Sequence, residues 1–247
     1  MPAHYDTIGI TYRRARLPDP RISEVIDRRL GDYTSVINIG AGTGSYESEA
    51  RQITAVEPSE VMIGQRLDAA APAVQAIAEA LPFSDGTFEA ATTFLSIHHW
   101  TDWRLGIREA LRVSDGRLLM FTWTGFPTGF WLTEYFPEII ELDEGLFPTI
   151  AELETITGPL VEEVVPIPAD CIDGFLCAYW QRPEAYLDAI VRAGMSTFAK
   201  IENVDERILE LKSDLATGVW DERFGHLRKV DAFDYGYRVL SCGLQSQ

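Results

Sequence analysis

Two adjacent histidines, His98 and His99, follow an apolar run in the segment Ser-Ile-His-His-Trp-Thr-Asp. Histidine changes its protonation state near neutral pH, so it often serves as a general base. We predict that His99 takes a proton from a hydroxyl group or an acidic carbon of a bound ligand, with His98 beside it. If the strand continues this far, successive side chains face opposite sides of the sheet, and one of the two histidines points into the protein core. A structural role for both is the alternative.

Three glycines, Gly40, Gly42 and Gly44, stand at alternate positions directly after the apolar run of residues 35–39. Glycine lets the chain turn sharply and lets a ligand approach the backbone closely. The spacing is GxGxG, whereas a nicotinamide dinucleotide site requires GxGxxG, whose third glycine would fall at Ser45. No GK[ST] follows, so the segment is not a P-loop. We predict a cofactor-binding loop, with an ordinary tight turn as the alternative.

A carboxylate, Glu57, ends the next β-rich run of residues 53–57. An acid at this place can accept hydrogen bonds from both hydroxyls of a ribose. A solvated acid at the end of a strand is the alternative. Met62 follows about one helical turn later, where it would lie against an adenine ring or in the core.

A third segment, residues 78–89, contains Ala-Glu-Ala-Leu-Pro-Phe-Ser-Asp-Gly-Thr-Phe-Glu and leads into another apolar run. Together with the glycine-rich loop and the acid after the second strand, it resembles the class I S-adenosylmethionine (SAM) dependent methyltransferases. The resemblance is greatest to the branch that includes the ubiquinone and menaquinone biosynthesis enzymes. It covers roughly residues 30–125 of the chain.

The resemblance implies that SAM is the cofactor and S-adenosylhomocysteine the product. It places the three glycines beneath the methionine and ribose parts of SAM, and Glu57 at the ribose hydroxyls. Ala78 and Glu79 then meet the edge of the adenine, Ala78 through its backbone amide. The sequence departs from the family at two positions. Asn38 stands where the family usually has an acid, and Ile77 stands where many members have an aspartate.

The N-terminal residues Tyr12 and Arg16 resemble the leading helix of the family, which closes over the cofactor. The resemblance implies that they contribute to cofactor binding. A charge-assisted hydrogen bond from Arg16 to the methionine carboxylate would be chemically reasonable. An ordinary surface arginine is the alternative.

Four aromatic side chains are candidates for the acceptor pocket: Trp100, Trp123, Phe126 and Trp131. Ligand pockets are mostly apolar with a few well-placed polar groups, so such rings suit the acceptor side. The aromatic segment that begins at Phe126 has no single helical period, and we interpret it as an insertion that covers the acceptor. A helical subdomain or a dimer contact that buries the same rings is the alternative.

Short β-rich runs that alternate with helical segments predict a doubly wound, Rossmann-like α/β sheet. N-terminal helices and an aromatic-rich insertion after strand five complete the predicted fold. Six strands are expected at residues 35–39, 53–57, 73–77, 88–96, 116–124 and 235–241. Helices are expected at residues 21–30, 59–69, 102–113, 182–193 and 205–217.

We predict one domain over residues 1–247, because no change of composition marks a linker. Residues 1–30 form an N-terminal helical cover, residues 31–124 the cofactor-binding core and residues 125–160 the acceptor-side insertion. The C-terminal part of the sheet and its helices take up residues 161–247.

The chain has a formal net charge of −17, which repels nucleic acid and anionic lipid surfaces. We therefore expect a small-molecule acceptor, no nucleic acid and no membrane partner, in a monomer or homodimer. Three cysteines without CxxC spacing and the lack of an apolar leader favour the cytoplasm. No aspartate and histidine set has the spacing of metal ligands, so no metal is expected.

Methyl transfer to an oxygen, nitrogen or carbon of a small organic molecule is the predicted function. A SAM-binding protein without methyl transfer, such as a cyclase or a regulator, is the first alternative, because cofactor binding involves the same motifs. An NAD-dependent dehydrogenase is the second, and Ser45 argues against it.

Overall fold

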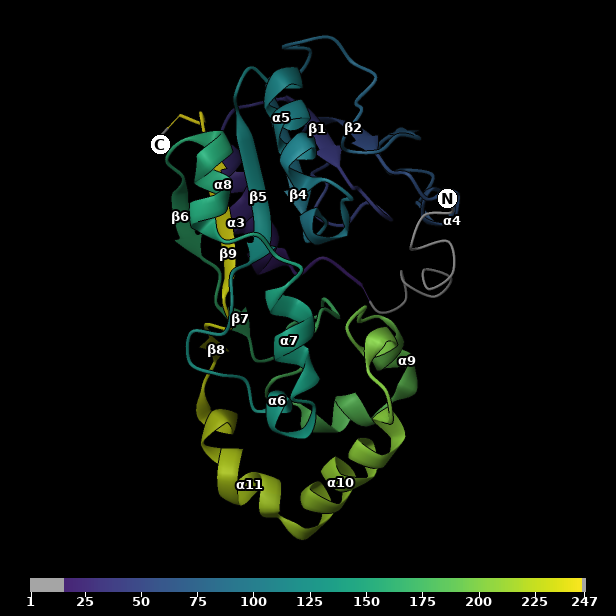
Figure 1. Cartoon of the computed structure of the whole chain (residues 1–247), viewed down its shortest axis with the longest axis vertical. Coiled ribbons are helices and arrows are strands. Elements are labelled where there is room, and N and C mark those ends of the chain that lie inside the picture. The colour runs from purple at the N-terminus through teal and green to yellow at the C-terminus, as the bar shows by residue number, and fades with distance from the viewer. Residues whose placement is uncertain (1–15, 246–247) are drawn as a thin grey trace.

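A seven-stranded sheet occupies the upper half of the protein in Figure 1, and a helical cap lies below it. The computed structural model describes residues 16–245, except for the side chains of residues 143 and 144. In spatial order the strands are β3 (Ala73–Val74), β2 (Gln52–Val56), β1 (Ser35–Ile39), β4 (Ala90–Phe94), β5 (Leu118–Trp123), β9 (Tyr237–Cys242) and β6 (Val161–Val164). The first five are parallel, and β9 is antiparallel to both of its neighbours. The predicted Rossmann-like α/β fold is thus confirmed.

Helices cover both faces of the sheet, because successive side chains of a strand point to opposite faces. On β5, Leu119 packs in the same core as α3 (Pro20–Leu30). The next residue, Met120, packs in the opposite core with α5 (Trp103–Val113) and α8 (Ile150–Thr157). Within residues 16–245, no helix is long and apolar enough to reach across a lipid bilayer.

The cap is built from two separate parts of the chain, residues 124–149 after β5 and residues 165–236 between β6 and β9 (Figure 1). Its α-helices are α6 (Leu132–Tyr135), α7 (Glu138–Glu144), α9 (Ala189–Ala193), α10 (Val204–Thr217) and α11 (Val219–Phe224). Short 3-10 helices and a two-stranded sheet complete it: η3 (Pro183–Leu187), η4 (Phe198–Lys200), η5 (Gly225–Lys229), β7 (Ile167–Pro168) and β8 (Ala232–Phe233).

Large aromatic side chains form the interior of the cap. Trp180, Trp220 and Tyr186 are completely buried. Trp131 lies among them, with its ring edge-on to Trp220 at 5.3 Å between centroids. Its indole N–H donates to the carbonyl oxygen of Trp180 at 2.7 Å, which satisfies the polar group of a buried ring. These rings are therefore buried in the hydrophobic core that the cap shares with the α3 face of the sheet.

Several predicted bounds were wrong, each for a local reason. The helix expected at residues 59–69 is only α4 (Glu60–Ile63), because Arg66 turns inward to the glycine-rich loop. The helix expected at residues 182–193 divides into η3 and α9, because Asp188 has an extended backbone and caps α9. The strand expected at residues 73–77 pairs over two residues at the edge of the sheet.

The edge strand β6 and the helix α8 were also predicted incompletely. Strand β6 was missed, because its sequence Val-Glu-Glu-Val has no clear apolar pattern at the sheet edge. Helix α8 was assigned to the insertion of residues 125–160, but its Leu153 is buried in the α5-side core. The excursion into the cap after β5 therefore ends before α8.

Gly236→Ala should destabilise the protein more than Gly129→Ala, although both glycines have a left-handed backbone, with φ of 87° and 79°. A β-carbon at residue 236 would lie 1.6 Å from the carbonyl oxygen of Gly125, whereas one at residue 129 would meet no described atom within 4 Å. The left-handed strain costs roughly 1–2 kcal/mol in both variants. The clash adds roughly 1–3 kcal/mol in Gly236→Ala alone. Equal free energies of unfolding in urea would contradict this prediction.

Candidate functional site

A cavity of about 590 Å³ opens beyond the carboxyl ends of β1 and β4, where the order of the sheet reverses. Open α/β sheets bind ligands at such a point, because the loops from the two neighbouring strands leave in opposite directions. The lining comes from the glycine-rich loop after β1, the end of β2, the segment after β3 and the turn after β4. All three sequence motifs therefore meet in one cavity.

Two of the three predicted loop glycines face this cavity. Gly40 and Gly42 line it with left-handed backbone, at φ of 70° and 52°. A β-carbon on Gly40 would lie 2.4 Å from the hydroxyl oxygen of Ser96, so no larger residue fits. Gly44 has φ of 95° but lies outside the lining, and a β-carbon there would come within 3.2 Å of the Glu47 carboxylate. Gly44 thus packs against Glu47 and Arg66, and its place beneath the cofactor stays a prediction.

Glu57 stands in the wall of the cavity at the end of β2 and is only 5% exposed. Its two carboxylate oxygens accept backbone N–H groups of Gly42 at 2.8 Å and Ser59 at 2.9 Å. These bonds hold the glycine-rich loop against β2. A carboxylate has about four lone-pair sites, so hydroxyl groups of a ligand can bind beside the two amides.

Met62, Ile77, Ala78 and Glu79 line one end of the same cavity. Met62 is buried, whereas the apolar side chain of Ile77 is 51% exposed. An exposed apolar side chain in a concave wall offers a contact for a flat apolar ring, as adenine requires. The carboxylate of Glu79 accepts the backbone N–H of Asp102 at 2.9 Å, which fixes it at the edge of this space.

The floor of the cavity holds a buried polar network around Asn38. The Asn38 amide nitrogen donates to Glu47 at 3.0 Å, and Glu47 in turn pairs with Arg66 at 2.5 Å. The Asn38 carbonyl oxygen is buried and accepts no hydrogen bond from any described residue. A buried acceptor is costly when unsatisfied, so it suits a ligand donor such as the amino group of SAM. The cavity therefore offers groups that suit both the adenine and the amino group of the predicted cofactor.

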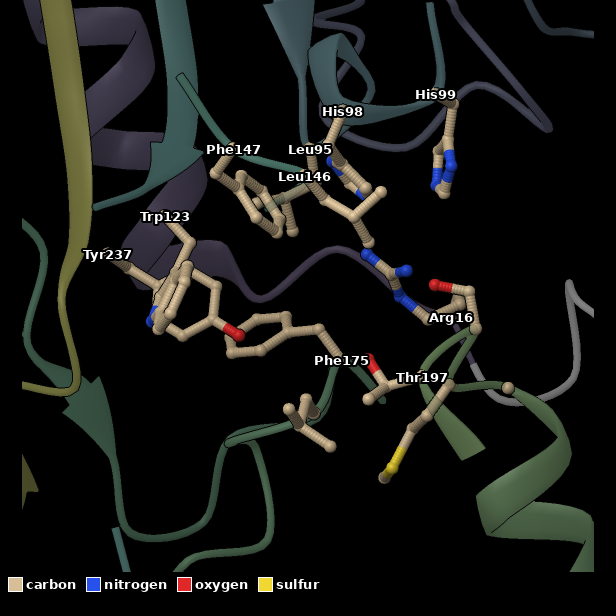
Figure 2. A pocket seen from close by; sticks show the side chains of 14 residues that line it. Arg16, Leu95, His98, His99, Trp123, Leu146, Phe147, Phe175, Thr197 and Tyr237 are labelled. Atoms are coloured by element: carbon tan, nitrogen blue, oxygen red, sulfur yellow. The ribbon is translucent and has the colours of Figure 1, made fainter. Parts of the chain in front are cut away.

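Figure 2 shows a second cavity, of about 60 Å³, at the junction of the sheet and the cap. It shares Arg16, Leu95 and His99 with the larger cavity, so the two spaces meet at these side chains. The Leu95 backbone is left-handed at φ of 49°, a strained state for leucine that concentrates at functional sites. The remaining lining residues are His98, Trp123, Leu146, Phe147, Phe175, Leu176, Gly194, Met195, Ser196, Thr197 and Tyr237.

His98 and His99 lie on a single turn of 3-10 helix, η2 (Ile97–His99), because β4 already ends at Phe94. The expected alternation of the two side chains across a strand was therefore wrong. Their rings lie 3.8 Å apart, and both line the smaller cavity. His98 also stacks on Phe147 at 4.1 Å, whereas His99 reaches the larger cavity as well. Among the described residues, no cluster of three or more ligands could hold a metal ion.

Arg16 lies at the wall shared by the two cavities, and Asp173 holds it there. The Arg16 Nε atom donates to Asp173 at 2.5 Å, and the carboxylate is completely buried. The hydroxyl of Tyr46, from the glycine-rich loop, donates to the same carboxylate at 2.7 Å. Burial and the neighbouring Asp173 charge raise the pKa of Tyr46, so this hydroxyl stays protonated. Tyr12, also predicted at the cofactor, lies outside the described residues.

The predicted acceptor residues divide among three places. Trp123 lines the smaller cavity, and Trp100 lines the larger one instead. Phe126 packs behind Trp123, at 4.7 Å between centroids, and lies outside both linings. Trp131 belongs to the aromatic core of the cap, because its ring and its N–H are both occupied there.

Other lining residues were missed. Phe175, Thr197 and Tyr237 come from a part of the chain with no motif. In the sequence they look like ordinary core or surface residues. Only the return of the cap and β9 to the end of the sheet brings them to the cavity.

The family model for a methyltransferase domain matches residues 37–120. A protein from Anabaena variabilis, described as a methyltransferase of an antibiotic biosynthesis pathway, is similar to this chain, with 32% identity and a TM-score of 0.84. The alignment covers 93% of this chain and 99% of that one. The likeness extends over the cap as well as the sheet. A search of curated protein sequences finds no significant match.

Two more distant structures share the fold. Phosphoethanolamine N-methyltransferase 2 of Haemonchus contortus, in complex with SAM, has 15% identity and a TM-score of 0.57, over 98% of this chain and 57% of that one. The [4+2]-cyclase SpnF has 18% identity and a TM-score of 0.52, over 98% of this chain and 97% of that one.

Glu57→Ala should weaken the binding of SAM by roughly 1.5–3 kcal/mol, the usual loss for a hydrogen bond to a charged group. The variant also releases the amide of Gly42, so the loop loses an anchor. Glu60→Ala is the matched control, because this acid is exposed on the next turn of the chain. Calorimetric titration with SAM measures both. Wild-type affinity in Glu57→Ala would show that this carboxylate does not hold the cofactor.

Proposed function

Because the chain belongs to the class I SAM-dependent methyltransferases, we propose that it methylates an oxygen, nitrogen or carbon of a small organic molecule bound in the smaller cavity. The observation that carries this proposal is the meeting of the two cavities at Arg16, Leu95 and His99. A methyl group passes directly between two molecules only if both are held in contact with water excluded. Two adjacent cavities with shared lining residues support such an arrangement.

When bound, the cofactor supplies an electrophilic methyl group on a positively charged sulfur. The protein's own residues contribute binding and orientation. Gly40 and Gly42 let the ligand approach the backbone, and Glu57 accepts its ribose hydroxyls. Asn38 accepts its amino group, and Ile77 and Met62 contact its adenine. The linings and hydrogen bonds of the larger cavity support these roles.

We assign the general base to His99, because it lines both cavities. A base must reach the acceptor atom that loses a proton, and that atom must lie next to the methyl donor. His98 lines only the acceptor side, and its ring stacks on Phe147. We therefore give His98 the role of supporting the His99 ring and forming the pocket wall.

The fold alone does not establish methyl transfer, since this chain also shares it with a cyclase. The direct test is the release of S-adenosylhomocysteine from SAM with a panel of small acceptors. Acceptor-dependent release supports methyl transfer. SAM binding without release on any acceptor would instead favour the alternative of a SAM-binding cyclase or regulator.

His99→Ala should lower kcat by roughly 10²–10⁴-fold, the usual contribution of a general base, and leave SAM affinity close to that of the wild type. The loss should shrink at high pH, where the acceptor ionises without help. His226→Ala is the matched control, since this histidine is exposed on η5, away from both cavities. Loss of SAM affinity in His99→Ala would assign His99 to the cofactor site, and an unchanged kcat would remove it from the chemistry.

A further inference from the structure

A chain of three buried polar side chains, Arg66, Glu47 and Asn38, lies at the floor of the larger cavity. One carboxylate oxygen of Glu47 accepts from the Arg66 guanidinium at 2.5 Å, and the other accepts from the Asn38 side-chain nitrogen at 3.0 Å. The side chains of Arg66 and Glu47 are 5% and 7% exposed, and Asn38 is 1% exposed. Protein groups rather than bulk water therefore satisfy Glu47 on both sides.

The amide of Asn38 has two ends of similar size, an NH₂ group that donates and an oxygen that accepts. An ionised carboxylate can only accept, so Glu47 selects the NH₂ end. The Asn38 oxygen must then point away from Glu47. It is buried and accepts no hydrogen bond within the described part of the chain, and Asn38 lines the larger cavity, whereas Glu47 does not. A residue outside the lining thus decides which end of this amide a ligand meets.

Arg66 holds Glu47 in place. Besides its bond to Glu47, it donates to the backbone carbonyl oxygens of Gly42 at 3.1 Å and Ala71 at 3.0 Å. A guanidinium has donors only, so both neighbours of Glu47 donate to it and neither competes for an acceptor. A buried charge is costly unless it is paired, and the Arg66–Glu47 pair meets this requirement. The orientation of the Asn38 amide therefore follows from the chemistry of its partners.

We propose that Glu47 is a positioning residue, which turns the Asn38 oxygen toward the larger cavity and so sets the recognition of the cofactor's amino group. This inference rests on the proposed function, in which Asn38 accepts that amino group. Glu47 acts only through Asn38. With the amide inverted, its NH₂ group would face an ammonium group that also has donors only, and the hydrogen bond would be lost.

Glu47→Gln should invert the Asn38 amide. Glutamine is close to glutamate in shape but has a single accepting oxygen. The charged Arg66 takes that oxygen, because a hydrogen bond to a charged group is stronger than one between neutral groups. The new NH₂ group then faces Asn38 and attracts the Asn38 oxygen, which leaves the cavity with a donor in place of an acceptor.

The test uses two ligands that differ only in the amino group. S-adenosylhomocysteine carries it, whereas 5′-S-(3-carboxypropyl)-5′-thioadenosine keeps the carboxylate and lacks it. Calorimetric titration gives both dissociation constants, and their ratio is the readout. The wild type should bind S-adenosylhomocysteine at least tenfold more tightly, and Glu47→Gln should lose at least tenfold of this preference. A wild type without preference, or an unchanged ratio in Glu47→Gln, would overturn the proposal.

A double variant, Asn38→Asp with Glu47→Gln, exchanges the amide and the carboxylate between the two positions. The amide at position 47 can then donate to the carboxylate at position 38, whose second oxygen faces the cavity. Every partner in the chain is satisfied again, so this variant extends the test even if Glu47→Gln folds poorly. It should restore at least the wild-type preference for S-adenosylhomocysteine. A double variant without that preference would contradict the proposed role of Glu47.

Two control variants separate the amide orientation from the position of the loop. Arg66→Lys keeps the positive charge but loses the planar fork that reaches Gly42 and Ala71 as well as Glu47. It should weaken both ligands to the same degree and keep their ratio. A ratio as low as that of Glu47→Gln would assign the effect to the loop and overturn the proposal. Glu49→Gln changes an exposed acid of the same segment and should match the wild type.

The failure of this proposal is distinguishable from the failure of methyl transfer, because binding of these two ligands needs neither an acceptor nor turnover. The expected ratios without acceptor-dependent release of S-adenosylhomocysteine would sustain the role of Glu47 and contradict the proposed activity. Methyl transfer with a ratio that Glu47→Gln leaves unchanged would do the reverse.

Discussion

A carboxylate with no access to water, Asp173, connects the three parts of the chain that enclose the site. Burying a charge is costly unless it is paired and hydrogen-bonded. Asp173 meets this requirement with Arg16 from the N-terminal segment and Tyr46 from the glycine-rich loop. Both contacts form together only where the cap, the N-terminal segment and the loop after β1 meet at the end of the sheet. The junction between the two cavities lies at this point.

The surrounding contacts extend the same connection. Arg21 pairs with Asp170, and the buried Asp19 accepts the backbone N–H of Ile172, so residues 16–21 run along the chain that leads to Asp173. On the other side of the cavity, Glu57 holds the glycine-rich loop through Gly42. The cofactor loop is thus tied to β2 at one end and to the cap at the other. The larger and smaller cavities consequently share a wall that is held in place from both sides.

The sequence predicted most of the sheet and most of the cofactor cavity, because those features are local. Gly42 and Glu57 belong to short motifs that end adjacent strands, and the order of those strands brings them together. The acceptor side was predicted poorly. Asp173 lies 157 residues from Arg16 and 127 from Tyr46, a pairing that no local pattern indicates. Trp123 and Trp131 look alike in the sequence, yet one lines the cavity and the other fills the core of the cap.

The position of β9 between β5 and β6 has a consequence for how this protein can change. Residues 165–236 leave the sheet at β6 and return to it at β9, which pairs with β6 along Val161–Val164. Both ends of this long excursion are therefore fixed side by side, whatever lies between them. The entropy of closing such a loop grows only slowly with its length, by about 0.6 kcal/mol for each doubling. Changes of length within the excursion that leave Asp173 in place can thus alter Phe175, Met195 and Thr197 at little entropic cost of closing the loop. The chain thus separates the segment that lines much of the smaller cavity from the strands that carry the glycine-rich loop.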